Sequence, residues 1–177
     1  MTVVRSSSLT PIRQPSMPSS QPQRSSAAPA APQGWVAQRA PLLPGFGNEA
    51  RSMSAIAAAV RSGQIDPSTV EAQLHAIPTP SKAEVGALWT PAGARTRHEL
   101  MAAYSQLAAV APNARLDPNP VNGYRPTVRE AGMHFQFTKA MAEQNPAARQ
   151  FAADFLQTFP NSPSALGIRN IASRLPG

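Results

Sequence analysis

The sequence contains no cysteine, little charge and few aromatic residues. Without cysteine there is no disulfide framework, thiol nucleophile or thiolate metal site. The three histidines, His75, His98 and His134, lack the spacing of metal ligands. The longest weakly polar run, Ala55–Val60, is too short to span a bilayer, and Arg5 with three serines interrupts any apolar core of a Sec signal. We therefore expect no membrane span, no metal and no cofactor.

Acidic residues are also absent before Glu49, and this divides the chain in two. Residues 1–45 hold 8 Pro, 8 Ser, 5 Gln and four Arg, whereas residues 46–177 hold 12 basic and 9 acidic residues. Pro, Ser and Gln make up nearly half of the first part, and such a composition buries too little apolar surface to fold. We predict a disordered Pro/Ser-rich segment over 1–45 and a folded domain over 46–177.

Helix signals recur along the second part, and strand signals do not. A first helix is expected from about Glu49 to Ser62, with Gly63 as its stop. Further helix starts are indicated by an N-cap at Asp66-Pro67, by capping boxes at Ser81, Thr96 and Thr127, and by an Asn145-Pro146 cap. A last helix is indicated by an apolar face of Ile168, Ile171, Ala172 and Leu175. The fold class is therefore all-α, a disordered tail followed by a bundle of about six short helices.

Two stretches stand out within this domain. Phe151, Phe155 and Phe159 follow helical spacing and give the strongest core signal. The segment Pro112–Pro126 carries four prolines and predicts an extended connection without structure. Such a long loop in a compact domain is often functional.

No common enzyme motif occurs in the chain. Several carboxylates already have a structural explanation at capping positions: Asp66, Glu84, Glu99 and Glu130. We therefore predict no catalytic residue. The alternative is an enzyme whose site forms only in the folded chain, and it would need a pocket converging on Glu143, His134 or Asp154.

The net charge of +7 raises the alternative of nucleic-acid binding. The basic residues are dispersed, and the longest cluster is Arg95-Thr96-Arg97-His98. Nucleic acid is therefore not the expected partner. A non-specific basic face would require four residues to lie together in the fold: Arg125, Arg129, Lys139 and Arg149.

The acid-free, Ser- and Pro-rich N-terminus without a Sec signal resembles the export signal of bacterial type III secreted effectors. Such a segment enters a narrow channel unfolded, and a polar chain interrupted by proline stays unfolded without help. The resemblance implies secretion, delivery into a host cell, and a secretion chaperone as one partner.

Two patches of the domain resemble the kinase-binding helical module of the HopAB (AvrPtoB-like) effectors. They are residues 54–69 and residues 155–163 with Gly167-Ile168. In that family the module docks on host immune receptor kinases through an exposed loop. The resemblance implies four partner-binding residues: Phe159, Pro160, Asn161 and Pro163. The ubiquitin-ligase domain of the family is not expected here.

The leading hypothesis is a non-enzymatic type III effector that binds a host protein, with a receptor-type kinase as the specific candidate. A basic nucleic-acid-binding or secretion-apparatus accessory protein and an unrecognised helical enzyme remain the alternatives. Phe159 also has two interpretations, as a helix-end core residue or as an exposed contact. In the core interpretation, Asn161 caps the turn.

Overall fold

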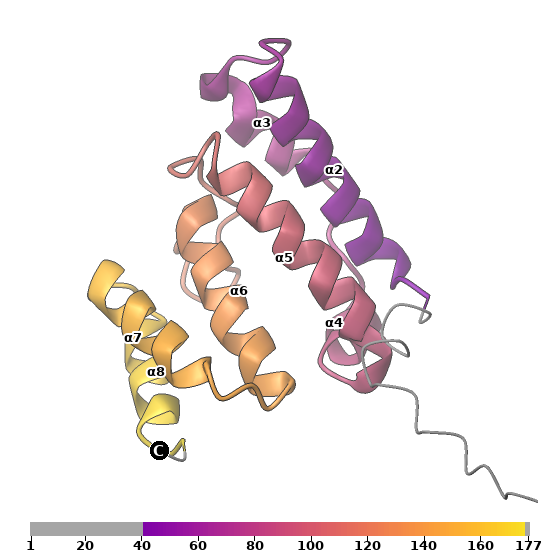
Figure 1. Cartoon of the computed structure of the whole chain (residues 1–177). Coiled ribbons are helices and arrows are strands. Elements are labelled where there is room, and N and C mark those ends of the chain that lie inside the picture. The colour runs from indigo at the N-terminus through magenta and orange to yellow at the C-terminus, as the bar shows by residue number, and fades with distance from the viewer. Residues whose placement is uncertain (1–40, 176–177) are drawn as a thin grey trace, which may run out of the picture. The chain divides into compact units, whose positions relative to one another are not determined.

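The part of the chain that the structure describes is helical (Figure 1). A computed structural model describes residues 41–175, which contain seven α-helices and no strand beyond an isolated bridge. The elements are α2 (Pro44–Arg61), η1 (Pro67–Thr69), α3 (Val70–His75), α4 (Lys82–Leu88), η2 (Pro91–Gly93), α5 (Ala94–Ala108), α6 (Val128–Ala142), α7 (Ala148–Thr158) and α8 (Ala165–Ala172). The all-α prediction is confirmed. Residues 1–40 of the predicted disordered segment lie outside the described residues.

Several predicted helix ends are confirmed. The Asp66 carboxylate accepts a hydrogen bond from the Ser68 amide at 2.8 Å and caps η1, which leads into α3. Ser81 and Glu84 form the reciprocal capping box at the start of α4. Gly63 follows α2 with a φ of 74°, a backbone conformation that glycine adopts without steric cost.

The first helix begins earlier than expected, at Pro44 rather than near Glu49. Proline suits the first turn of a helix because its fixed φ matches the helix and its missing N–H leaves no donor unpaired. The Leu43 amide donates to the Thr96 hydroxyl at 3.0 Å, and the Gly45 amide donates to the Glu84 carboxylate at 2.6 Å. These bonds fasten the start of α2 to α4 and α5.

The capping box predicted at Thr96 is wrong. The η2 turn leads directly into α5, which begins at Ala94, so Thr96 lies inside the helix. Thr96 is fully buried and Arg97 is 3% exposed. The helical turn already begins at Pro91, a residue that suits the first turn of a helix, and this turn precedes the S/T-x-x-E pattern at Thr96.

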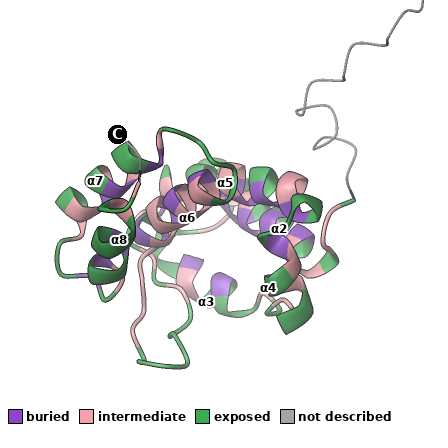
Figure 2. Cartoon of the chain, turned by 90° about the horizontal axis from the view of Figure 1, so that it is seen from below, coloured by how far each residue is buried: buried purple, intermediate pink, exposed green. Residues whose placement is uncertain are grey.

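The helices pack mainly on their neighbours, α2 on α5, α5 on α6, α6 on α7, and α7 on α8 (Figure 1). Two groups of buried side chains result. Figure 2 marks the buried residues along these helices. The N-terminal cluster joins α2 to α5 and the start of α6, and includes Met53, Leu74, Leu100, Leu107 and Val128. The C-terminal cluster joins α6, α7 and α8 through Phe137, Ala152, Phe155 and Ile168.

The end of the chain departs from prediction in two details. Ile171 was placed on the apolar face of the last helix, but its side chain is 45% exposed, while Ile168 is buried. Asn145 accepts a hydrogen bond from the Ala147 amide at 2.9 Å, in a turn before α7, and does not cap the helix itself. Because α8 is short, one narrow stripe is enough to cover the C-terminal cluster.

The segment Pro112–Pro126 forms no helix or strand, as predicted for an extended connection, but it has an internal hydrogen-bond pattern that the sequence did not indicate. It forms a hydrogen-bonded hairpin arm, with an antiparallel bridge between Arg115 and Thr127. The backbone amide of Asn119 donates a hydrogen bond to the Tyr124 carbonyl at 2.8 Å. Gly123, with a φ of 68°, allows the turn. The prolines remove some donors, but the remaining amides suffice to pair the two sides.

Candidate functional site

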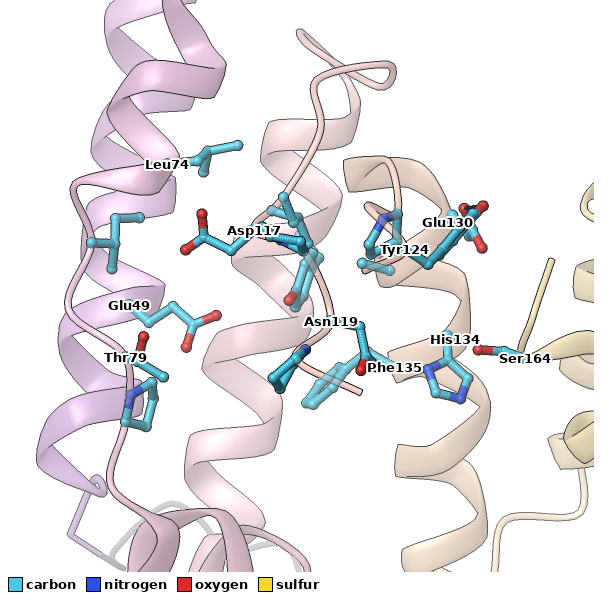
Figure 3. A pocket seen from close by; sticks show the side chains of 18 of the residues that line it. Glu49, Leu74, Thr79, Asp117, Asn119, Tyr124, Glu130, His134, Phe135 and Ser164 are labelled. Atoms are coloured by element: carbon cyan, nitrogen blue, oxygen red, sulfur yellow. Dashed lines mark hydrogen bonds between the residues drawn. The ribbon is translucent and has the colours of Figure 1, made fainter. Parts of the chain in front are cut away.

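An open groove of about 730 Å³ is lined by elements that are far apart in the sequence (Figure 3). The start of α2, the connection between α3 and α4, the hairpin arm, α5, α6 and the loop before α8 all contribute. Glu49 and Thr79 lie on one side, His134 and Ser164 lie on the opposite side, and Asn119 of the hairpin arm lies between them. The volume is typical of ligand sites, which span roughly 300–1,000 Å³.

Aromatic rings and prolines give the groove its apolar surface. The ring of Phe135 lies 5.7 Å, centroid to centroid, from both Trp89 and Tyr104. Trp89 remains 40% exposed. Prolines from three segments also line the groove: Pro78, Pro80, Pro118, Pro120, Pro126 and Pro163. These side chains have few rotatable bonds, so a bound ligand would order little of the protein.

The charged lining residues are all acidic, apart from one histidine. Glu49, Asp117 and Glu130 contribute carboxylates, whereas no lysine or arginine of residues 41–175 lines the groove. The whole chain carries a net charge of +7. The groove therefore has the opposite sign of charge from the chain as a whole.

Glu49 has an unusual environment. Its side chain is half-buried, and it has no hydrogen bond or ion pair with any other described residue. Burial disfavours the charged carboxylate and raises the pKa of Glu49 to about 7. The neighbouring phenol of Tyr104 has its pKa raised as well, first by burial and then by the charge of Glu49.

Glu130 was predicted to complete a capping box with Thr127, and only half of that box forms. The Thr127 hydroxyl accepts from the Glu130 amide at 3.2 Å, but the Glu130 carboxylate instead accepts from the Tyr124 hydroxyl at 2.8 Å. Glu130 is 4% exposed. One turn later, burial lowers the pKa of His134, against the opposing effect of Glu130, so His134 is neutral at pH 7.

The hairpin arm is held in place by contacts with α3. Asp117 contacts the His75 ring, and the Arg125 guanidinium lies 3.2 Å from the Glu71 carboxylate and 2.8 Å from the other nitrogen of the His75 ring. The Arg115 amide donates a hydrogen bond to the second carboxylate oxygen of Glu71 at 3.0 Å. This hydrogen bond is the main cause of the lowered pKa of Glu71. The acidic and proline residues of the arm are thereby placed along the groove.

The four predicted partner-binding residues are divided between core and surface. Phe159 is half-buried, packs against the C-terminal cluster, and its ring lies 5.6 Å from that of Phe155. Pro160, Asn161 and Pro163 are exposed, and of the four only Pro163 lines the groove.

The turn within this loop is stabilised by Ser162 rather than by Asn161. Ser162 is 9% exposed, and its hydroxyl accepts from the Ser164 amide at 3.1 Å. The side chain of Asn161, which the core interpretation of Phe159 assigned to capping, makes no hydrogen bond with any described residue.

The three residues named for a hidden active site do not converge. His134 lines the groove, but Glu143 pairs with Arg97 at 3.2 Å and with Lys139 at 2.7 Å, and Asp154 accepts from Gln150 at 2.7 Å. Within residues 41–175, no three His, Asp or Glu side chains are grouped as metal ligands are.

The four basic residues named for a nucleic-acid face come from the hairpin arm, α6 and α7, and three of them make local contacts. Arg125 contacts Glu71, Lys139 pairs with Glu143, and Arg149 donates to the Leu175 carbonyl.

Sequence reasoning missed most of the groove. Glu49, Tyr104, Asp117 and Tyr124 come from three segments, and no local spacing connects them. For Glu49 itself, its position after a long acid-free stretch was the one available signal. No known protein family, curated protein or solved structure matches this chain. Among the described helices, none is long and apolar enough to cross a membrane.

Proposed function

We propose that this chain is a non-enzymatic effector that is exported through a type III secretion system and binds a host protein, with a receptor-type kinase as the candidate partner. The observation that carries the binding part is the exposed loop of Pro160, Asn161 and Pro163, which borders the open groove through Pro163. A loop beside a groove with rigid apolar walls is a suitable surface for a protein partner.

Exposed apolar side chains near both loops support this proposal. Val121, at the tip of the hairpin arm, is 91% exposed, and Leu166, three residues after Pro163, is 64% exposed. Large apolar residues at such exposure are candidates for burial against a partner. The export part of the proposal rests on the acid-free composition of residues 1–45.

The binding part is tested by affinity capture from host-cell lysate with the full-length chain. The double variant Asn161→Ala/Pro163→Ala is compared with Asn170→Ala, an exposed control on α8. We expect the native chain and the control to retain the same host protein, which mass spectrometry identifies as a kinase, and the double variant to lose it. Equal capture by the double variant would remove the loop from the proposal.

The export part is tested with a reporter fused to residues 1–45. We expect export that depends on the type III secretion ATPase and that weakens when acidic residues are inserted at Ser19 and Ser20. Equal export from a strain without the ATPase would contradict this part.

A further inference from the structure

We propose that the groove binds a cationic side chain of a partner polypeptide, with arginine preferred. The inference rests on the proposed function only in taking the partner to be a protein. It concerns the groove itself, which shares Pro163 with the exposed loop, and it follows from the charge and ring content of the groove lining.

The sign of the charge indicates a cation. Three carboxylates line the groove and no lysine or arginine from the described part of the chain does, although basic residues outnumber acidic ones in the whole chain by 16 to 9. Other acidic side chains of the fold already have partners, such as Glu71 with Arg125 and Glu143 with Arg97. The fold thus pairs its basic residues elsewhere and leaves the groove acidic.

Glu49 is the residue that a ligand would satisfy. Its half-buried carboxylate accepts no hydrogen bond from any described residue, yet it lies in the groove beside Tyr104. A buried charge without a partner is unfavourable, and a bound cation with N–H donors removes that penalty. Glu130 differs because the Tyr124 hydroxyl already donates to it.

The rings favour a planar cation. Trp89, Phe135 and Tyr104 form a connected row of rings, and Trp89 is 40% exposed. A guanidinium group stacks on aromatic faces and donates two parallel hydrogen bonds to a carboxylate, which an ammonium group cannot do. An arginine side chain can therefore use both features of the groove at once.

The dependence on pH has a definite sign. Binding requires an ionised Glu49, whose pKa is about 7, and it is opposed by a protonated His134, whose pKa is lowered by burial. Ionisation of Glu49 strengthens binding as the pH rises from 6 to 8, and the lowered pKa of His134 confines its opposing charge to more acidic pH. The titratable groups that line the groove are Glu49 on α2, Tyr104 on α5, Asp117 and Tyr124 on the hairpin arm, and Glu130 and His134 on α6.

The test is a titration of the full-length chain with the peptide acetyl-Ala-Arg-Ala-amide, followed by amide NMR shifts. The same peptide with citrulline keeps the shape of arginine without its charge, and a lysine peptide tests the preference. We expect shifts at groove residues such as Ala131 and Asn119, no binding of the citrulline peptide, and weaker binding of lysine.

Glu49→Gln should weaken binding of the arginine peptide about tenfold or more, as loss of a charge-assisted bond does. The matched control is Glu99→Gln, an exposed carboxylate on α5 outside the groove, which should leave the affinity unchanged. Affinity should be higher at pH 8 than at pH 6 for the native chain, with a smaller difference for Glu49→Gln.

Several results would overturn the proposal. One is the absence of NMR shifts at groove residues up to about 20 mM peptide, which is far above ordinary dissociation constants. Others are equal binding of the citrulline peptide, tighter binding of the lysine peptide, or an unchanged affinity of the Glu49→Gln variant for the arginine peptide. Sedimentation that shows the peptide dissociating a dimer would assign the groove to a second copy of the chain. Groove shifts on replacing Arg5, Arg13, Arg24 and Arg39 by Gln, without peptide, would assign it to the chain's own N-terminal residues. None of these results depends on host-lysate capture, so the two proposals fail separately.

Discussion

Glu49 shows how one side chain can connect stability, charge and binding. In the unfolded chain its pKa has the ordinary value of 4.5, and in the folded chain it is about 7. The folded state therefore holds this proton more tightly. The stabilising contribution of the protonated group is complete below pH 4.5 and is lost as the pH rises through 7.

We predict that Glu49→Gln raises the free energy of unfolding at pH 8 by on the order of 1–3 kcal/mol and changes it little at pH 4.5. The uncharged amide removes the cost of ionising a half-buried carboxyl group. Denaturant unfolding at a series of pH values measures the difference. An equal effect of the substitution at both pH values would contradict the assigned environment of Glu49.

Phe159 combines the two interpretations that the sequence left open, because it is half-buried against Phe155 at the end of α7. We predict that Phe159→Ala lowers the free energy of unfolding by about 2–3 kcal/mol, somewhat less than a fully buried phenylalanine would lose. Asn161→Ala and Pro163→Ala should change it by less than about 0.5 kcal/mol, since both are exposed.

Thermal and denaturant unfolding of the three variants measure these differences. Destabilisation by Asn161→Ala as large as that of Phe159→Ala would show that the whole loop is part of the core. A normal stability for Phe159→Ala would show that the ring is an exposed contact.

At the scale of elements, Arg97 joins three parts of the bundle. Its guanidinium donates to the carbonyls of Leu88 at 2.6 Å and Thr90 at 2.8 Å, and it pairs with Glu143 at 3.2 Å. The end of α4, the body of α5 and the residue after α6 thus share one buried cation. A buried charge whose partners are all present is stable, and removing its donors leaves carbonyls unsatisfied.

We predict that Arg97→Lys lowers the free energy of unfolding by about 2–4 kcal/mol, because one ammonium group cannot reach three acceptors arranged for a planar fork. Arg169→Lys, at an exposed position on α8, is the matched control and should stay within about 0.5 kcal/mol of the native chain. Denaturant unfolding compares the two. A small change in the free energy of unfolding for both variants would mean that the hydrogen bonds of Arg97 do not stabilise the bundle.

The sequence predicted those elements whose signals are local. Asp66, Ser81 and Gly63 mark helix ends through bonds or backbone angles within a few residues, and these predictions are confirmed. The Thr96 motif looked the same, but its hydroxyl bonds to Leu43, which lies 53 residues away. A pattern of four residues cannot report such a contact.

The hairpin arm and the groove were beyond sequence reasoning for the same reason. The arm depends on Glu71 of α3 accepting from Arg115 and Arg125, and the groove depends on side chains from several elements meeting across the fold. Neither arrangement leaves a period or a motif in the chain. The loop at Pro112–Pro126 was correctly singled out as unusual, although its structure was not predicted.

At the scale of the whole molecule, α2 begins two residues before the predicted domain start. The amides of Leu43 and Gly45 make long-range hydrogen bonds, and both precede the predicted domain start at residue 46. A fragment of residues 46–177 lacks these bonds and the first turn of α2, whereas a fragment of residues 41–177 keeps them.

We predict that the fragment 41–177 melts within about 2 °C of the full chain and that the fragment 46–177 melts roughly 3–8 °C lower, as the loss of one to two kcal/mol implies for a domain of this size. Thermal unfolding monitored by circular dichroism measures both. Equal midpoints for the two fragments would support the boundary predicted from sequence. A large loss in the fragment 41–177 would show that the first forty residues contribute to folding.

The division of buried side chains into two clusters has a consequence for local unfolding. Helix α6 contributes Val128 to the N-terminal cluster and Phe137 to the C-terminal cluster, while α7 and α8 depend on the second alone. The last two helices can therefore detach as a unit and leave the first cluster intact. In native-state hydrogen exchange, amides of α7 and α8 should share one low opening free energy, and those of α2 and α5 should exchange only on global unfolding. Since Pro163 and Ser164 line the groove, each such opening would also remove one end of its lining.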